Sequence, residues 1–550
     1  MSVNPMPQLK ANGRPSGEAL VWLTSMGLAV GLSMVFFLLW TIVSNGASVF
    51  WPKRVQAWTV EVDSKREVIW GELAKVQDKK VGTGSEMQVF TANRDALGSS
   101  FRWIDQKDIR ATELPTGVIE LERMEYGAAI GMPVKLTLSD GGSLEASDPA
   151  FRDRLSTLVA DVSDRRAQLS LIEKGEIGRN SRDILRQEII VKRSARTKDT
   201  AGQAAAEAEI TRLKSDYATL SASATALREQ QGGNRLVIRL ANGKERKINV
   251  GQIVAFHFPN EMGLFERIGK TGANVWKFLS ENPREANTEG GIFPAIVGTF
   301  VMTMLMSVVV TPFGVLAAIY LREYARQGPF VRAVRIAVNN LAGVPSIVFG
   351  VFGLGFFVYG VGGSIDHMLF EDRLPTPTYG TGGIIWAAAT LALMTVPVVI
   401  VATEESVAAV PRGAREGSLA LGASKWQTIQ RIVLPAAVPG ILTGLILAMA
   451  RGAGEVAPLM LVGVVKLAPG LPIDGTWNDT DLLPFLHLDQ KFMHLGFHIY
   501  DLGFQSPDSD AAKPMVFATT FFLICLVLVL NLTAILMRER LRKKFATGAF

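Results

Sequence analysis

The sequence predicts an all-α, polytopic membrane protein with six membrane-spanning helices and one mixed α/β insertion. Of its 550 residues, 48% are hydrophobic, and the apolar residues are clustered in long runs. One long segment, 44–289, separates the first run from the second and contains both strand-like and helix-like patterns. These observations favour a bundle of membrane helices with an attached domain over a soluble globular fold.

Each predicted span is an apolar run long enough to cross the hydrocarbon core, which takes about 20 helical residues. Five runs contain no Asp, Glu, Lys or Arg, and a sixth is interrupted only by Arg451 and Glu455. A core over 290–537 would hold all but the first span. The predicted spans are 19–43, 292–320, 336–360, 382–403, 439–465 and 514–537.

Basic residues in the short flanking segments predict the orientation, because cytoplasmic loops are enriched in Lys and Arg. Four segments are basic: the N-terminal tail 1–18, the loop after the second span with Arg322, Arg326, Arg332 and Arg335, the loop 404–435 and the C-terminal tail 538–550. We therefore expect both termini in the cytoplasm and the insertion 44–289 in the periplasm. The net charge of +6 reflects this orientation, and no pattern indicates a nucleic-acid site.

The first span has a charged region before it but no small-residue cleavage site closely after it, so we expect a retained anchor and not a cleaved signal. The one cysteine, Cys525, lies in the sixth predicted span. One cysteine excludes an intrachain disulfide framework and a Cys-based metal site.

The insertion is too long for a linker and should form a domain. Strand-like residues occur at 118–124 and 134–146, and 235–250 reads as a hairpin around Asn242-Gly243. Heptad-like spacing over about 150–230, with a polar stretch between its halves, predicts an antiparallel coiled-coil hairpin. We favour a structural stalk or docking surface here over a ligand site. Residues 259–288 read as an amphipathic helix leading into the second span.

Arg451 and Glu455 are the sharpest chemical feature of the sequence. Counted from Pro439, Arg451 lies about 18 Å along a helix with a rise of 1.5 Å per residue, which is near mid-membrane. A charge there costs on the order of 3 kcal/mol even on lenient insertion scales. Four residues apart, the two side chains can pair on one helix face. They form either an internal salt bridge that fixes helix packing or part of a polar path for a charged solute.

Other motifs are weaker. His494 and His498 stand at helical spacing with His487 nearby, but nothing completes a zinc site, and we expect no metal. There is neither a glycine-rich phosphate loop nor a Ser-His-Asp arrangement, so we expect no catalytic residues and no hydrolysis by this chain.

The stretch 415–435, REGSLALGASKWQTIQRIVLP, is half polar and half apolar and predicts a helix between two spans. It resembles the coupling motif of binding-protein-dependent ABC importer permeases, E-A-A, three residues, Gly, nine residues, then I-x-L-P. The matching residues are Glu416, Gly422, Ile432, Leu434 and Pro435, and Gly417 and Ser418 replace the two alanines. The resemblance implies that these seven residues form a short helix lying in a groove of an ATPase subunit.

Further stretches narrow the resemblance to the phosphate-specific permeases, in particular the long bacterial form of the PstA subunit family. They are GGIFPAIVGT (290–299), YLREYA (320–325), GVPSIVFG (343–350) and ARGAGEVAPL (450–459). The resemblance covers about 285–545. It implies a type I ABC importer permease fold with Arg451 and Glu455 on the phosphate path.

It also implies partners: a second permease subunit (PstC-like), two ATPase subunits (PstB-like), a periplasmic phosphate-binding protein, the lipid membrane and a phosphate-sensing regulator. ATP and Mg²⁺ would be used by the ATPase, so this chain would carry no cofactor. We expect a phosphate importer subunit in the bacterial inner membrane. The alternatives are a permease for sulfate or molybdate, or a membrane sensor or scaffold that works through its periplasmic coiled coil.

Overall fold

A computed structural model describes residues 19–546 apart from 63–64, 80–82, 476–482 and 507–508; the predicted tail 1–18 lies outside the described residues. Within the described chain, six helical segments are long and apolar enough to cross a membrane, which confirms the six-span prediction. They run over Trp22–Ser48, Phe293–Tyr324, Ser346–Leu369, Ile384–Ala409, Lys425–Gly454 and Ala512–Lys543.

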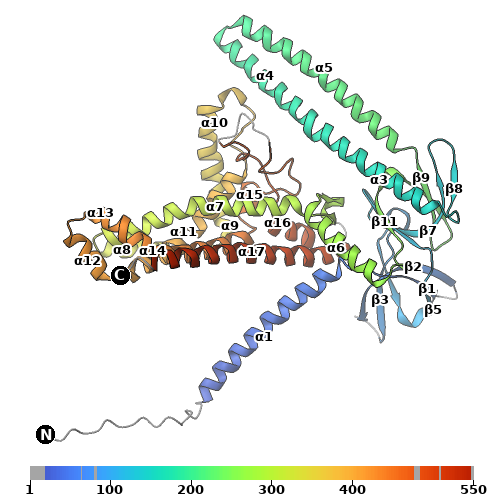
Figure 1. The fold of residues 1–550 in the computed structure, drawn as a ribbon, viewed down its shortest axis with the longest axis horizontal. Helices are drawn as coiled ribbons and strands as arrows, with labels where there is room; N and C mark the ends of the chain where they lie inside the picture. Colours follow the sequence, from blue (N-terminus) through green and yellow to red (C-terminus); the bar gives the residue numbers. More distant parts are fainter. Residues whose placement is uncertain (1–18, 63–64, 80–82, 476–482, 507–508, 547–550) are drawn as a thin grey trace.

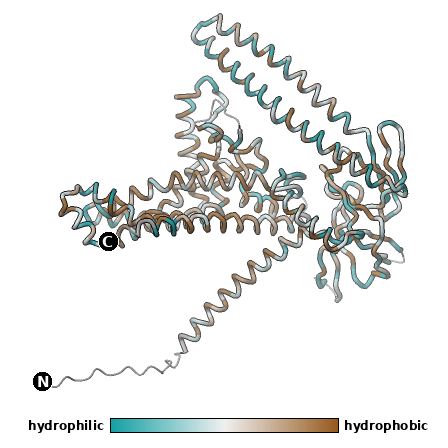
Figure 2. Tube along the Cα trace, viewed as in Figure 1, coloured by the Kyte–Doolittle hydropathy of each residue, from teal (hydrophilic) through white to brown (hydrophobic). Residues whose placement is uncertain are grey.

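Four long helices pack side by side as the centre of the bundle, and the first span diverges from them (Figure 1). Hydrophobic residues run along the length of this bundle (Figure 2). The core is built from the apolar faces of α7, α11 and α14, with Met302, Leu391 and Ala448 fully buried. The main helices are α1 (Ala19–Ser48), α7 (Phe293–Ile319), α11 (Ile384–Ala409), α14 (Leu434–Gly454) and α17 (Ser509–Ala546).

Two predicted spans have different bounds in the structure. The third was expected at 336–360, but residues up to Leu341 belong to a separate amphipathic helix, and the span begins at Ser346 after Pro345. The fifth was expected at 439–465, but its helix begins before Pro439 and ends at Gly454. Pro345, immediately before the third span, cannot continue the preceding helix, which separates that helix from the span within one apolar run.

Shorter helices complete the bundle and its loops. They are α8 (Pro329–Leu341), α9 (Ser346–Phe352), α10 (Gly363–Leu369), α12 (Arg412–Ala420), α13 (Lys425–Thr428), α15 (Leu459–Val462) and α16 (Leu495–Tyr500). A π-helical segment, Gly353–Gly362, joins α9 to α10 within the third span. α17 extends beyond the predicted 514–537 at both ends.

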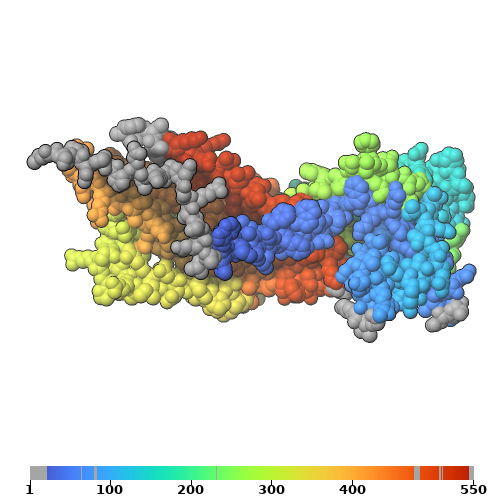
Figure 3. All heavy atoms as spheres, turned by 90° about the horizontal axis from the view of Figure 1, so that it is seen from below, coloured from blue at the N-terminus to red at the C-terminus, as the bar shows by residue number. Residues whose placement is uncertain are grey.

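Residues 55–257 contain two antiparallel sheets that form the β domain at the far end of the elongated molecule (Figure 3). The first sheet has the order β4-β3-β2-β1-β5, and the second β10-β9-β7-β6-β11 with β8 on β7. Gly243, at φ 78°, forms the predicted turn between β9 and β10. The strands are β1 (Val55–Val62), β2 (Lys65–Asp78), β3 (Ser85–Phe90), β4 (Phe101–Asp105), β5 (Ile109–Glu113), β6 (Ile119–Arg123), β7 (Ala129–Thr137), β8 (Ser143–Glu145), β9 (Arg235–Arg239), β10 (Glu245–Asn249) and β11 (Ile253–His257), with the short helix α2 (Arg94–Leu97) between β3 and β4.

A long helical hairpin projects from the β domain. Its ascending arm comprises α3 (Phe151–Ser170), a π-helical segment (Leu171–Ile177) and α4 (Gly178–Thr197), and its descending arm is α5 (Thr200–Gln231). The first predicted heptad positions do not pack across the hairpin: Phe151, Leu155, Leu158 and Val162 are buried in the core of the second sheet. The reason is that this sheet offers α3 a continuous apolar surface.

The hairpin folds back so that its tip meets the loop between the third and fourth spans (Figure 1). Arg193 pairs with Asp372 at 2.9 Å, and Arg196 pairs with Glu371 at 2.9 Å and with Asp372. The helix α6 (Leu264–Ser280) and the two-residue strands β12 (Pro283–Arg284) and β13 (Glu289–Gly290) connect the β domain to α7.

Candidate functional site

The helix α14 ends inside the bundle, and Arg451 lies in its last turn. Its neighbour Gly452 packs so closely on α7 that an added Cβ would lie 2.5 Å from Met306 Sδ. Met306 is midway along α7, so Arg451 lies level with the middle of that helix. The negative end of the helix dipole is a favourable place for a guanidinium group.

Arg451 and Glu455 are an ion pair, with Nε and Oε1 3.7 Å apart. They do not share a helix face, contrary to the spacing argument, because Glu455 follows the last helical residue and has an extended backbone with ψ 139°. Both side chains are partly exposed, at 37% and 22%, whereas Ala453 between them is fully buried. The pair therefore stands at an accessible break in a membrane helix, the kind of site at which discontinuous helices present charge to a solute.

The chain after Glu455 packs on two of the stretches that carry the family resemblance. Gly350, in GVPSIVFG, lies against Pro458, where an added Cβ would be 2.7 Å from Pro458 Cα. Gly298, in GGIFPAIVGT, lies against the Met493 carbonyl, and Thr299 Oγ1 accepts a hydrogen bond of 2.9 Å from the Leu495 amide. Irregular backbone at membrane depth is tolerated where protein surrounds it. The contacts with Gly350, Gly298 and Thr299 show that the segment after Glu455 is surrounded in this way.

The stretch 415–435 is not one helix. α12 ends at Ala420, a turn follows with Gly422 at φ 84°, and α13 begins after Ser424, whose side chain caps the Gln427 amide. Residues 429–435 already belong to the fifth span. Gly422 permits the positive φ that a side chain would resist, and this conformation turns the chain between the two helices.

Of the coupling residues predicted from sequence, Glu416, Gly417 and Gly422 are exposed on α12 and its turn. Ser418 is half-buried, and its hydroxyl lies 3.0 Å from that of Thr428, which holds α12 against α13. The remaining three, Ile432, Leu434 and Pro435, lie at the junction of the π-helical segment Ile429–Val433 with α14.

The loop is fastened to the end of the second span, through the stretch YLREYA. Arg415 pairs with Glu323 at 2.6 Å and donates to the Val407 carbonyl. Lys425 donates to the Glu323 carbonyl and lies 5.1 Å from the centre of the Tyr324 ring. Both pairing side chains of the Arg415–Glu323 contact are mostly buried. Sequence reasoning missed the roles of Glu323 and Arg415, although YLREYA was conspicuous as a motif.

Apolar side chains on this loop point away from the bundle. Leu421 is 91% exposed, and Leu419 and Trp426 are also exposed. We call Leu419, Leu421 and Trp426 the loop surface; it lies at the end of the bundle near the C-terminus (Figure 1). Three large apolar groups on one short polar loop are typical of a protein-binding surface.

The histidines noted in the sequence are buried among other residues and serve the packing of the fold. His494 and His498 are buried near the start of α16, and burial lowers the pKa of His494 to about 3 and that of His498 to about 4. His487 pairs with Asp474 at 2.9 Å. Across the described residues, no group of three or more His, Cys, Asp or Glu side chains is arranged to hold a metal ion.

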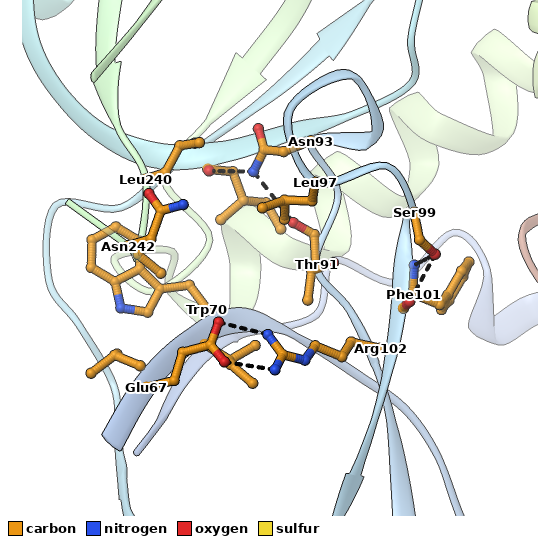
Figure 4. A pocket seen from close by; sticks show the side chains of 14 residues that line it. Glu67, Trp70, Thr91, Asn93, Leu97, Ser99, Phe101, Arg102, Leu240 and Asn242 are labelled. Atoms are coloured by element: carbon orange, nitrogen blue, oxygen red, sulfur yellow. Dashed lines mark hydrogen bonds and ion pairs between the residues drawn. The ribbon is translucent and has the colours of Figure 1, made fainter. Parts of the chain in front are cut away.

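The β domain contains a cavity of about 290 Å³ between its two sheets (Figure 4). At one side Glu67 and Arg102 form a bidentate pair with distances of 2.7 and 2.6 Å, and Asn93 donates to the Ile130 carbonyl at 2.8 Å. The guanidinium beside Glu67 holds the pKa of that carboxyl below its usual range. No site residue predicted from the sequence lies in this cavity.

The helical bundle is similar in sequence to known transport proteins. Residues 310–547 match the family model described as binding-protein-dependent transport system inner membrane component. The probable ABC transporter permease protein YqgH of Bacillus subtilis is 32% identical over 207 residues, or 37% of this chain and 63% of the relative. The phosphate transport system permease protein PstA of Mycobacterium leprae is 37% identical over 200 residues, or 36% of this chain and 60% of the relative.

The chain thus covers less than two thirds of the length of these two relatives. A second probable ABC transporter permease of Bacillus subtilis, YqgI, is 29% identical over 291 residues, or 52% of this chain and 92% of the relative. Among solved structures, an inward-facing MetNI methionine ABC transporter aligns with 48% of this chain and 97% of its own at 17% identity, with a TM-score of 0.32.

Proposed function

We propose that this chain is a multi-pass permease subunit of an ATP-driven phosphate importer, because residues 310–547 match the family model of binding-protein-dependent transport system inner membrane components. Relatives named as phosphate transport system permeases, at 37% identity, support the choice of substrate. The single observation that carries the coupling role is the loop surface, in which Leu421 is 91% exposed. The chain itself would be non-catalytic.

The loop would pass motion from an ATPase to the bundle. Because Arg415 and Lys425 both bind the end of the second span at Glu323, a displacement of α12 pulls on α7 as well as on α14. α7 and α14 meet again at Met306 and Gly452, beside Arg451. ATP-driven closure of the partner would therefore rock these helices and expose Arg451 first to one side and then to the other.

Arg451 would hold the anion, and Glu455 would tune that hold. The guanidinium group has five donors in a planar fork that matches the oxygens of a tetrahedral anion. The distance of 3.7 Å from Arg451 Nε to Glu455 Oε1 is longer than that of a charge-assisted hydrogen bond. The contact is therefore weak, and an anion that binds Arg451 would displace Glu455 easily.

The assembly would contain a second, PstC-like permease, two PstB-like ATPases and a periplasmic phosphate-binding protein. ATP and Mg²⁺ would bind the ATPases, and a phosphate-sensing regulator could read the transport state of the complex. The positive charges of the loop 404–435 support a cytoplasmic loop surface, with both termini on the same side of the inner membrane and the insertion in the periplasm.

The experiment that tests this role is affinity purification of the full chain from its native membrane, with mass spectrometry of what remains bound. An ATPase, a second permease and a phosphate-binding protein are expected together. Recovery of the chain with none of these would contradict the proposal.

A second candidate function is a membrane sensor or scaffold that works through the hairpin, and the contact of the hairpin tip with Glu371 and Asp372 favours it. Removal of 60–250 separates the two functions. A transporter retains uptake without that segment, whereas a sensor loses its output.

A further inference from the structure

The helix α6 (Leu264–Ser280) turns its polar side toward the protein. Arg267 is buried and donates hydrogen bonds to the carbonyls of Pro52 at 2.9 Å and Pro259 at 2.5 Å. Asn274 donates to the Phe50 carbonyl at 3.1 Å. Lys277 pairs with Glu122 of β6 at 3.3 Å, and burial lowers the pKa of Lys270 beside them.

Its apolar side faces outward. Phe265 is 88% exposed and Trp276 is 70% exposed, with Leu264 and Ile268 also exposed. At 100° per residue these four positions fall within one third of the helix circumference. Gly272 lies in the same arc and Gly269 lies just beyond its edge, and a Cβ added to either would meet nothing within 4 Å. A helix on the surface of a soluble domain turns its apolar side to the core and its polar side to water. In α6 the apolar side is the outer one, so an apolar environment outside this chain must cover it.

The position of α6 beside the ends of the membrane spans indicates what covers its apolar side. Its Phe278 ring packs on Phe50, at the end of the first span, and on Phe522 of the sixth, with centroids 5.3 and 5.6 Å apart. The Ile292 amide donates to the Phe278 carbonyl at 2.8 Å, one residue before α7 begins. α6 is thus fixed to the ends of three membrane spans, at the end of the bundle that adjoins the β domain (Figure 1).

From these contacts we propose that α6 lies in the lipid interface of the membrane and buries its Leu264, Phe265, Ile268 and Trp276 face among the lipids. Trp276 is suited to this level, because indole rings are enriched where headgroups meet acyl chains. α6 would therefore anchor the β domain at the membrane surface and hold it beside the start of α7.

The positions of the charged residues on α6 predict whether its attachment depends on the charge of the lipids. Interfacial helices with Lys and Arg on their outer rim prefer anionic lipids. Here Arg267, Lys270 and Lys277 are on the protein side, where they meet carbonyls and carboxylates. Attachment should depend on apolar contact and occur equally in zwitterionic membranes.

Spin labels test this placement. In a Cys525→Ala background, the full chain with the subunits that co-purify with it is reconstituted in phosphatidylcholine vesicles. Nitroxides are attached in turn at Phe265→Cys, Ile268→Cys and Trp276→Cys, and at Leu171→Cys in the hairpin as the exposed control. Collision rates with oxygen, which concentrates in lipid, and with a water-soluble nickel chelate are measured by electron paramagnetic resonance.

The ratio of oxygen to nickel collisions should be several-fold higher at the three α6 positions than at position 171, in each case with phosphate uptake retained. A ratio at all three positions equal to that of the control would place α6 in water and overturn the proposal. Protection from both reagents, lost when the second permease is removed, would assign the face to a protein partner instead and would also overturn it. Neither outcome touches the permease role, which is read from uptake.

Discussion

The bundle and the β domain with its hairpin use charge in different ways. In the bundle, ion pairs are few and partly buried: Arg415 and Glu323 are 22% and 13% exposed. In the β domain and hairpin, many pairs are open to solvent, such as Arg102 with Glu67 at 49% each, and the buried pair of Arg123 with Asp95 holds the fold of the β domain far from the bundle. Exposed pairs contribute about 0–1 kcal/mol, whereas breaking a buried pair costs several. Charge in the bundle is therefore where function should be most sensitive to substitution.

The largest effect is expected at the helix break. Arg451→Gln removes the positive charge and leaves a shorter, uncharged amide, and ATP-driven phosphate uptake should fall by roughly 100-fold, because hydrogen bonds to charged groups contribute up to about 3 kcal/mol. Uptake into proteoliposomes measures this. Arg540→Gln, on the exposed surface of α17 and outside the loop 404–435, is the control and should retain uptake. Equal uptake by both variants would remove Arg451 from the anion path.

The second-largest effect is expected from a substitution in the loop surface. Leu421→Asp places a charge in the loop surface that we propose binds the ATPase, and recovery of that subunit should fall about 10- to 100-fold, as for a residue that dominates an interface. Quantitative co-purification measures it. Leu171→Asp, on an exposed hairpin position, is the control. If ATPase recovery were unchanged in Leu421→Asp, the docking assignment would be wrong.

The connection between the β domain and the bundle should respond to pH. Burial raises the pKa of Glu289, four residues before α7, to about 7 from its ordinary 4.5. The folded chain keeps this proton while the unfolded chain has lost it, so thermal stability should fall as pH rises from about 5 to about 7. Glu289→Gln should flatten that slope, which thermal unfolding in detergent at several pH values would reveal. An unchanged slope would exclude Glu289 as its source.

The smallest effect is expected at the hairpin tip. Arg196→Glu breaks the exposed pairs with Glu371 and Asp372, which contribute little to stability because water and salt screen them. Hydrogen exchange at the tip should accelerate, while uptake changes less than twofold. A loss of uptake as large as that of Arg451→Gln would contradict the contrast between the two regions and favour the sensor or scaffold role.

Hydropathy predicts the six spans because about 20 apolar residues in sequence leave few other structures possible. The turn at Asn242-Gly243 and the helical arms of the hairpin were also predictable, since their signals are local. The coiled-coil pattern on α3 was misleading: the same spacing that suits a partner helix also suits a sheet, and Leu155 packs on the sheet.

The candidate site was only partly predictable. Arg451, Glu455 and Gly422 are conspicuous by residue type, but the end of α14 at Gly454 and the packing of Gly452 on Met306, which is distant in sequence, are seen only in the structure. The contact of Arg415 with Glu323 likewise joins two distant loops. For α6, the sequence predicts an amphipathic helix, but only the contacts of Arg267 show that its polar face is the inner one.

The most direct test of the central claim is ATP-driven uptake of radiolabelled phosphate by the purified complex in proteoliposomes, with excess sulfate or molybdate as competitor. A phosphate permease predicts uptake that requires ATP and that unlabelled phosphate abolishes while sulfate and molybdate leave it intact. Uptake suppressed equally by sulfate or molybdate would assign another oxyanion, and the absence of ATP-dependent uptake would contradict the transport function itself.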